Sequence, residues 1–515
     1  MMLTHVRCGR SAILILASFY ALLQSAAAAE QCDSNATLSV AQYKEAPTLD
    51  PAKTFGPASD GTRYWIYDTL VRITPTGGTA PGLATSWKFT TPTTFQMTLR
   101  QGVTFHDGAP FNAAAVKANF DRHRAFPGVT ANWKQPLAAV KELKVTGDYE
   151  VQYILEKANP AFAFNLAAAT GMIVSPAILN QKLDLIAVGT GPFKLMKYTP
   201  DAGADLIRND QYWDKEALAC SPKTVRLVNI VDTQALLNAA VAGQLDISHV
   251  DPNQVAQAKG AGLVVNSVPT QATHSFWFDY KNTPLRHPLV RKAMMYAVNR
   301  EALAKGLGLG LAVPNAQMFP ADFYAYNPAP EYQPAAYKYD PAKAKQLLAQ
   351  AGFPNGVTLK ALVLPFPFDQ ALLQAVQAQM AKAGITVTSQ IIANFAAYLA
   401  RQGDAYFGTG GGRPDPLDYV LTEVAANGTY NPDGFAPPPE LTAVLEKIAN
   451  TDPANPERAK LLQQASGLVT EHALTLPILT LQFNWVLNKC VVNFTPPLLG
   501  AIQPQGLGWK AGCKR

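Results

Sequence analysis

The chain lacks any hydrophobic run long enough to form a transmembrane helix. The one marked apolar run, residues 11–23, falls short of the roughly 18 residues that a span needs. Charge is also sparse: 16% of the 515 residues are charged, the formal net charge is +6, and no dense block of lysine and arginine occurs. These absences argue against a helical membrane protein and against nucleic acid as a partner.

Signatures of catalysis and of metal binding are missing as well. The seven histidines are scattered, and none pairs with another at i, i+4 or His-x-His spacing. The motifs G-x-S-x-G and G-x-x-x-x-G-K-[ST] do not occur, and the glycines at 306–310 close a predicted helix with no strand before it. His106-Asp107 is typical of a turn rather than a catalytic dyad. We therefore expect no enzyme, no metal and no cofactor.

The N-terminus has the pattern of a secretory signal peptide. Arg7 and Arg10 precede the apolar run, and small residues follow up to Ala29. Cleavage after residue 29 removes both arginines and leaves a net charge of +4. Cys32 lacks the small apolar lead-in of a lipoprotein anchor, so we expect the mature chain to be free in the periplasm. A buried N-terminal helix is the alternative, and the flanks fit it poorly.

Four cysteines remain after the signal peptide, an even number in a compartment that permits disulfides: Cys32, Cys220, Cys490 and Cys513. Four cysteines allow three pairings, and the sequence does not choose among them. We favour Cys32–Cys220 and Cys490–Cys513.

Helix and strand patterns alternate along the chain, most regularly in its second half. With 48% hydrophobic residues, 515 residues can bury a large core and are too many for one domain. Residues 357–364, 369–384 and 385–392 read as strand, helix and strand, and so short a crossover implies parallel strands. Residues 224–250 form a similar unit, and 286–307 reads as one strong helix. The pattern predicts an α/β protein with mixed sheets.

The stretch TLRQGVTFHDGAPFNAAAVKANFDR (98–122) is the most distinctive in the chain. It predicts a strand that ends at Arg100, a turn at Gly102 and Gly108, and a helix with Asn112 at its N-cap. This string resembles a signature of the family 5 extracellular solute-binding proteins of ABC importers. That family includes dipeptide, oligopeptide, nickel and opine receptors.

Three later stretches are similar to further signatures of the same family, and they occur in the family's order. They are residues 189–214, 287–303 and 337–353, so that the resemblance extends over nearly the whole mature chain. It implies a periplasmic binding protein type II-like α/β fold with mixed β-sheets, in which three domains form a two-lobed cleft that closes like a Venus flytrap.

The same resemblance implies a division of the chain into domains. Behind the signal peptide, 1–29, it assigns 30–70, 188–284 and 487–515 to domain I, 71–187 to domain II, and 285–486 to domain III. All four mature cysteines then fall in domain I, which makes pairing among them easier.

The glycine-rich stretch YFGTGGGRPDPLDY (406–419) is the one we expect to contact ligand. Its consecutive glycines leave backbone N–H groups accessible, and Arg413 can offer a planar fork to a carboxylate or phosphate. A flexible turn with a solvated arginine is the alternative, but members of the family build part of their pocket here. Our candidates in this stretch are Gly411, Gly412, Arg413 and Asp415.

At three positions the chain departs from relatives whose ligands are known. Peptide-binding relatives place an aspartate, which holds the ligand's ammonium, where this chain has Gly411 or Gly412. Nickel-binding relatives have a histidine where this chain has Leu417. Dipeptide binders carry a carboxylate-binding arginine before the helix near 369, and LPFPFDQ (364–370) has none. Burying an ammonium or carboxylate without a counter-charge costs several kcal/mol, so these absences disfavour a dipeptide.

Aromatic residues supply the remaining candidates. SFWFDYKN (275–282) alternates, so that Trp277 lies on one face of a predicted strand while Phe278 and Tyr280 lie on the other. The resemblance places this strand at the hinge between domains I and III, and we expect one of its faces to line the cleft; core packing is the alternative for each ring. Tyr43, at the end of the first predicted strand, is a further candidate.

Together these features predict a receptor rather than an enzyme. We expect a monomer that captures a small solute, bearing an anionic group, between domains I and III and delivers it to the permease subunits of an ABC importer. A peptide or glutathione-like oligopeptide receptor with non-standard anchors is the alternative. A secreted hydrolase and a chaperone-like protein are rivals from other classes.

Overall fold

The computed structural model describes residues 32–42, 48–53, 60–75, 77–126, 139–230, 232–281, 284–392, 402–410, 413, 415–426, 428, 430–431, 434–497 and 501–514. The predicted signal peptide, Tyr43, Gly411 and Gly412 lie outside these residues. Within them, no helix combines the length and the apolar character that a membrane span requires.

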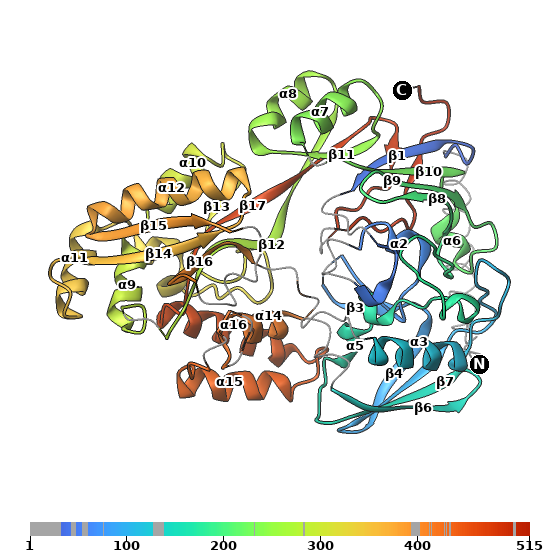
Figure 1. Ribbon diagram of the computed structural model, residues 1–515, viewed down its shortest axis with the longest axis horizontal. Helices are drawn as coiled ribbons and strands as arrows, with labels where there is room; N and C mark the ends of the chain where they lie inside the picture. The colour runs from blue at the N-terminus through green and yellow to red at the C-terminus, as the bar shows by residue number, and fades with distance from the viewer. Residues whose placement is uncertain are drawn as a thin grey trace, which may run out of the picture.

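A mixed sheet of 11 strands forms the backbone of the molecule and extends through both of its lobes (Figure 1). Its strand order is β15-β14-β16-β12-β17-β11-β1-β10-β9-β8, and β13 pairs with β17 off this path. The strands are β1 (Thr37–Gln42), β8 (Phe193–Thr199), β9 (Gly203–Arg208), β10 (Thr224–Asn229), β11 (Ile247–Val250), β12 (Val264–Phe278), β13 (Ala312–Pro314), β14 (Val357–Val363), β15 (Ile385–Ile391), β16 (Ala405–Gly410) and β17 (Thr475–Leu487).

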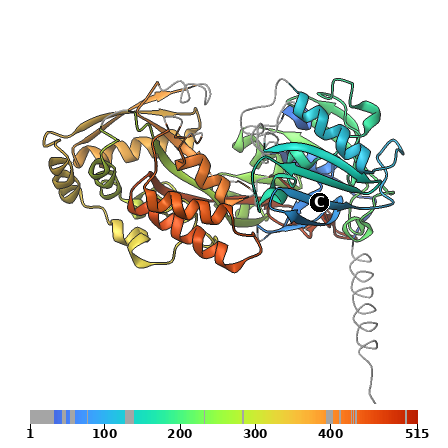
Figure 2. The same cartoon turned by 90° about the horizontal axis from the view of Figure 1, so that it is seen from below.

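Strands β12 and β17 connect the two lobes (Figure 1). They pair antiparallel from Val264↔Leu487 to Trp277↔Thr475, and the register shifts between Pro269 and Thr273 and again between His274 and Ser275. We call the part of the chain from Thr273 to Thr480 the second lobe and the rest the first lobe. Figure 2 shows the two lobes side by side. The boundaries predicted for domains I, II and III remain predictions.

The first lobe contains the β1–β10–β9–β8 part of the sheet. Helices α7 (Thr233–Val241) and α8 (Val255–Gly260) accompany it, and α2 (Arg63–Ile66), α6 (Lys215–Leu218) and the small sheet of β18 (Val491–Val492) and β19 (Gly508–Trp509) complete this part. Disulfides join Cys32 to Cys220 and Cys490 to Cys513, which is the pairing that we favoured from the sequence.

A separate antiparallel sheet within the first lobe carries the 98–122 motif. Its order is β4-β5-β7-β6, from β4 (Ala84–Thr91), β5 (Thr94–Leu99), β6 (Val140–Gly147) and β7 (Glu150–Leu155), and α3 (Ala113–Ala125) covers one face (Figure 2). The small sheet of β2 (Val71–Ile73) and β3 (Thr79–Pro81) and the short helix α5 (Phe162–Asn165) lie nearby in the chain.

The motif itself folds as predicted. Asn112 caps α3, because its side chain accepts a hydrogen bond from the Ala115 N–H at 3.0 Å. His106 and Asp107 lie in the turn: the His106 ring contacts the Gly191 carbonyl oxygen at 3.0 Å, and Asp107 accepts a hydrogen bond from Ser175 Oγ. These partners tie the turn to residues 175–191, so the motif is a structural element.

The second lobe is α/β around β14, β15 and β16. Its helices are α9 (Pro288–Tyr296), α10 (Arg300–Gly306), α11 (Pro341–Gln350), α12 (Pro367–Lys382), α14 (Pro416–Val424), α15 (Pro439–Ala449) and α16 (Pro456–Glu471). The predicted single helix 286–307 is wrong, because the structure has two helices there. Asn299 starts a new helix by accepting a hydrogen bond from the Ala302 N–H, and the buried Arg300 side chain donates to the carbonyl oxygens of Asn315 and Pro477.

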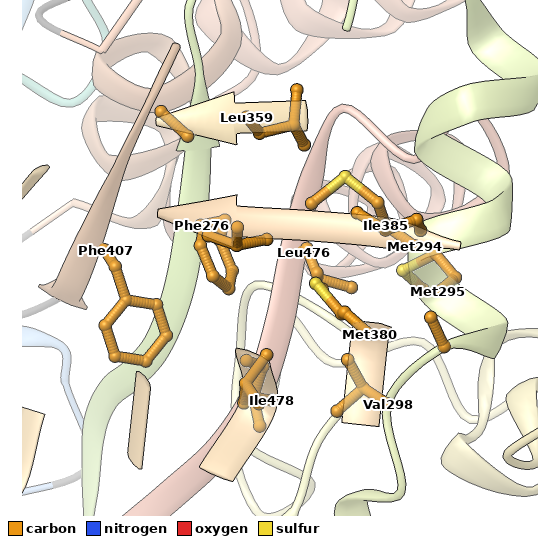
Figure 3. Packing of buried hydrophobic residues seen from close by; sticks show 14 of the residues in the cluster. Phe276, Met294, Met295, Val298, Leu359, Met380, Ile385, Phe407, Leu476 and Ile478 are labelled. Atoms are coloured by element: carbon orange, nitrogen blue, oxygen red, sulfur yellow. The ribbon is translucent and has the colours of Figure 1, made fainter. Parts of the chain in front are cut away.

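The core of the second lobe is apolar and drawn from segments far apart in the sequence. Figure 3 shows side chains from β12, α9, α12, β14, β15, β16 and β17 converging beside the sheet. Among those labelled are Phe276, Met294, Met380, Phe407 and Ile478, all buried. This core holds the sheet rigidly behind the strand ends where the candidate site lies.

Candidate ligand-binding site

The strand order of the second lobe points to one edge of the sheet. Strand β14 runs parallel to β15 on one side and to β16 on the other, although β15 and β16 both follow it in sequence. In open α/β sheets, ligands bind beyond the carboxyl ends of the strands where the order reverses in this way. That place is the end of β14 at Val363 together with the end of β16 at Gly410.

We call this region the switch-point edge. Its described residues are those after β14 (364–369), those at and after the end of β16 (Thr409, Gly410, Arg413 and Asp415), and His274 of β12, which is the cross-strand partner of Thr409. Arg413 and Asp415, two of the predicted ligand contacts, thus lie at the place that the topology independently selects.

Arg413 is partly exposed and lies between β16 and α14. Its positive charge acts on two acids of α14. Burial raises the pKa of Glu423 well above its usual range, while Arg413 and a hydrogen bond from Tyr419 oppose the rise. Burial and the nearby Asp415 raise the pKa of Asp418 to about 7, again opposed by Arg413. The guanidinium therefore lies near two carboxyl groups whose raised pKa values favour the protonated, uncharged form.

Asp415, by contrast, serves the packing of α14. It is 2% exposed, caps the helix by accepting from the Leu417 N–H at 3.1 Å, and receives Arg458 Nη2 at 2.9 and 2.8 Å on its two carboxylate oxygens. Burial raises its pKa and Arg458 opposes that rise. These contacts anchor α14 on α16 and leave little of the Asp415 carboxylate for a solute; its assignment as a ligand contact stays a prediction.

Trp277 belongs to a buried cluster of three aromatic rings. It is 0% exposed, and its ring is stacked against Tyr406 at a centroid distance of 5.4 Å and against Tyr430 at 4.6 Å. A Cβ on Gly410 would come within 2.3 Å of the Trp277 ring, so the first glycine of the run is required by this packing. The Tyr406 and Tyr430 rings also lie only 6.0 Å apart, so the three rings pack against one another, and Tyr430 is partly exposed. The assignment of Trp277 as a ligand contact stays a prediction.

The other two rings predicted on this strand lie in the core. Phe278 and Tyr280 are 1% and 3% exposed and belong to the apolar cluster of the second lobe. Tyr280 stacks on Phe435 at 4.2 Å, and its hydroxyl donates to the Leu474 carbonyl oxygen. The alternation of faces was predicted correctly, and the face of Phe278 and Tyr280 packs into the core. This is the core-packing alternative given for each ring, and their assignment as ligand contacts stays a prediction.

A polar cluster that the sequence analysis missed lies at the same edge. His274 Nε2 is 2.9 Å from Asp369 Oδ1 and 3.2 Å from Thr409 Oγ1, and the His274 ring packs against Phe368 at a centroid distance of 5.2 Å. The sequence pattern could have indicated His274. In the alternation of the strand it shares a face with Phe276 and Phe278, and a histidine on such an apolar face is unusual.

An exposed aromatic side chain completes the edge. Phe366 is 42% exposed and occupies the N-cap of α12, where serine, threonine, aspartate or asparagine would satisfy the helix better. An apolar ring at a position that breaks a local rule is typical of a functional surface.

No group of three or more histidine, cysteine, aspartate or glutamate side chains that could hold a metal occurs among the described residues. The edge instead combines a guanidinium, hydroxyl and imidazole groups, and apolar rings. Such an arrangement can bind a small organic molecule by hydrogen bonds and stacking without covalent chemistry.

Fold and site together define a two-lobed binding protein. A model of the bacterial extracellular solute-binding proteins, family 5 middle region, matches residues 78–432, more than half of the chain. The chain belongs to this family, which consists of transport proteins rather than enzymes. It is a substrate-binding protein of an ABC importer, as the resemblance implied.

Characterised relatives bind different solutes. The chain is 28% identical over 407 residues to the glutathione-binding protein GsiB of Salmonella typhi, covering 75% of this chain and 77% of that one. It is 26% identical over 471 residues to the dipeptide-binding protein of Escherichia coli K12, covering 82% and 85%.

Solved structures share the fold. The periplasmic binding protein DppA of Helicobacter pylori, in complex with the peptide STSA, has a TM-score of 0.78 at 24% identity, covering 93% of this chain and 99% of that one. AgaA of A. tumefaciens R10, in complex with agropinic acid, has a TM-score of 0.77 at 24% identity, covering 92% and 99%. The predicted fold class is therefore confirmed.

Proposed function

We propose that the protein captures one small solute bearing an anionic group, between the switch-point edge and the first lobe. The observation that carries this proposal is the position of Arg413 at the end of β16, partly exposed and beside acids whose pKa values are raised. An uncharged Glu423 does not neutralise the guanidinium, so its charge remains available to a carboxylate or phosphate.

The chain offers no matching anchor for a free ammonium group at the described part of this edge. Asp415 is committed to Arg458, and Asp369 to His274. Phe366 and Tyr430 offer apolar surface to the body of the solute. The ligand class that fits is a small organic acid or phosphate with an apolar or aromatic part.

Capture and delivery follow from the hinge. Strands β12 and β17 carry the connection between lobes, and the register shifts near Thr273 and His274 give this segment a locally irregular ladder. A solute that contacts both lobes favours the closed state, and the permease subunits recognise that state. We further propose that the chain is exported by its signal peptide and works as a free monomer in the periplasm.

The test combines mass spectrometry of whatever co-purifies with the protein and isothermal titration against dipeptides, glutathione, opines, sugar phosphates and aromatic acids. We expect an anionic solute to bind and Arg413→Ala to weaken it roughly tenfold to a hundredfold. Arg226→Ala, which removes an exposed arginine of β10 in the first lobe, is the matched control and should bind as wild type. If no small solute binds or co-purifies, the proposal fails.

A second candidate is a peptide or glutathione receptor with non-standard anchors. It is favoured by the relatives named as glutathione-binding and dipeptide-binding proteins. Binding of glutathione or of a peptide that survives Arg413→Ala would support it over the organic-acid reading.

A further inference from the structure

The segment GLGLGL (306–311), between α10 and β13, has a strained backbone. The φ angles of Leu309 and Gly310 are 48° and 81°, and a leucine rarely adopts this left-handed conformation. A Cβ on Gly308 would come within 2.2 Å of a side chain of β13, and the Leu311 N–H donates to the Gly308 carbonyl oxygen at 2.7 Å. A tight turn of this kind persists only where its surroundings hold it in place.

Beyond the turn, the backbone is attached to both lobes. Strand β13 pairs with β17 at Val313↔Thr480, which is the boundary of the second lobe. The Leu311 carbonyl oxygen then accepts a hydrogen bond at 2.9 Å from the N–H of Gln482, which belongs to the first lobe. The segment therefore adds a non-covalent connection to the two covalent ones along β12 and β17.

The Leu311 side chain packs against a hydrophobic cluster of the first lobe. We call it the α7–α8 cluster, and its buried members come from α7, α8 and the strands beside them: Ala41, Leu236, Leu237, Ala240, Leu245, Val250, Val255, Ala258 and Val486. Among the described residues that pack against this cluster, Leu311 is the one that comes from the second lobe. Leu309, two residues earlier, is 55% exposed. The turn thus places one leucine on the first lobe and leaves its neighbour in solvent.

The α7–α8 cluster and the candidate site lie on opposite sides of the strands that join the lobes. In Figure 1, α7, α8 and α10 lie above the crossing of β12 and β17, whereas α14, which follows Arg413, lies below it. A rotation about these two strands that brings the lobes together on the side of α14 moves them apart on the side of α7 and α8. Closure around a solute therefore loosens the Leu311 contact.

We propose that the segment 306–311 is a strap that holds the lobes apart, and that a solute must loosen the Leu311 contact in order to close the cleft. The free energy of this contact then opposes binding, because closing the lobes gives it up. The strap sets the affinity of the receptor from a place that the solute does not touch. The inference rests on the proposed function and deepens it, and neither the comparisons nor the motifs assign a role to this segment.

Isothermal titration measures the effect of the strap on affinity. The probe is the compound that binds wild type among a dipeptide, glutathione, an opine, a sugar phosphate and an aromatic acid. We expect Leu311→Ala to bind it roughly threefold to tenfold more tightly, because an apolar contact of the open arrangement is lost. Damage to the fold would weaken binding, so a gain in affinity is specific to the strap.

Two variants serve as controls for Leu311→Ala. Leu311→Met keeps an apolar side chain of similar volume and should stay within about threefold of wild type. Leu309→Ala shortens the exposed leucine of the same turn, which does not belong to the α7–α8 cluster, and should bind as wild type.

A solute-free measurement tests the strap independently of the ligand. Dyes attached through Lys144→Cys on β6 and Lys447→Cys on α15, both exposed, report the distance between the lobes by single-molecule energy transfer. Leu311→Ala should raise the closed fraction, and by the same factor as it raises affinity, because apparent affinity scales with the fraction of competent molecules. An unchanged distribution overturns the inference.

The remaining outcomes separate this inference from the proposed function. If wild type binds a compound and Leu311→Ala binds it equally or more weakly, the strap is refuted while the proposed function stands. If wild type binds none of the compounds, the proposed function fails, and the closed fraction of Leu311→Ala alone decides whether the strap exists.

Discussion

At the scale of single residues, Asp418 of α14 shows how the environment of Arg413 is tuned. Its pKa is raised from 3.8 to about 7 by burial and by the charge of Asp415, while Arg413 and Arg458 oppose the rise. Between these values the folded state binds a proton that the unfolded chain does not. The ionisation of Asp418 therefore lowers the free energy of unfolding as the pH rises from about 4 to about 7.

Asp418→Asn removes this dependence. At pH 4 the variant and wild type should unfold at the same temperature, since the wild-type carboxyl is protonated in the folded state. At pH 8 the variant should unfold at a higher temperature, by roughly 2 °C. Differential scanning calorimetry across pH 4–8 measures the difference.

The control for this experiment is Asp121→Asn on α3, which removes an exposed carboxylate that pairs with Lys117. It should give no advantage that grows with pH. If the unfolding temperatures of Asp418→Asn and wild type differed by the same amount at every pH, the prediction would be contradicted.

Local chemistry in the sequence is enough to nominate single residues for the candidate site. Arg413 is nominated because it follows a glycine run, and its contact with ligand stays a prediction. The burial of Trp277 depends on Tyr430, and the role of Asp415 depends on Arg458, which is 43 residues away in the chain. His274 meets Asp369 only after β12 and α12 pack. Such partners are set by tertiary structure, so local patterns do not reveal them.

At the scale of elements, α14 follows the strand end at the candidate site and is fastened to α16 by the buried ion pair of Asp415 and Arg458. Asp415 and Arg458 have side chains that are 2% and 3% exposed. A buried pair is weak evidence for net stability, but removing one partner leaves an uncompensated buried charge.

Arg458→Leu should therefore lower the free energy of unfolding by about 3–5 kcal/mol. Adding Asp415→Asn to that variant should restore part of the loss, because the stranded charge is then gone. Urea denaturation followed by circular dichroism measures both.

Lys460→Met on the same helix is the matched control. Its ion pair with Glu457 has side chains 73% and 57% exposed, so the change should stay below about 1 kcal/mol. Similar losses for Arg458→Leu and Lys460→Met would refute the anchoring role of Asp415.

Elements with strong caps were the most predictable. Asn112 precedes α3 and accepts a backbone N–H in its first turn, as its sequence context indicated. Asp340 caps α11 in the same way. The helix break between α9 and α10 was missed, because the apolar periodicity of 286–307 continues through it. What separates the two helices is the cap at Asn299 and the buried hydrogen bonds of Arg300, and periodicity does not record either.

At the scale of the whole molecule, the α/β class and the family were predictable from four motifs in order. The continuous sheet through both lobes was not. It depends on β12 pairing with β17, whose partners Val264 and Leu487 are more than 200 residues apart in sequence. Long-range strand pairing of this kind leaves no local signal.

The two disulfides should differ in their effect on stability. Cys32–Cys220 joins residues 188 apart and Cys490–Cys513 residues 23 apart. In the chain-entropy model, losing the longer link by Cys32→Ser and Cys220→Ser should cost about 2 kcal/mol more than losing the shorter one by the same exchange. Urea titration of the two double variants measures the difference, and equal losses would contradict this ordering.

The crossing of β12 and β17 between lobes has one more consequence. The chain enters the second lobe along β12 and leaves it along β17, and Thr273 and Thr480, where it enters and leaves, are direct cross-strand partners. In covalent terms the second lobe is a single insertion whose two ends already touch. The second lobe is therefore a unit whose two chain connections lie side by side, so it can be exchanged between relatives at Thr273 and Thr480 while the first lobe keeps its own chain path.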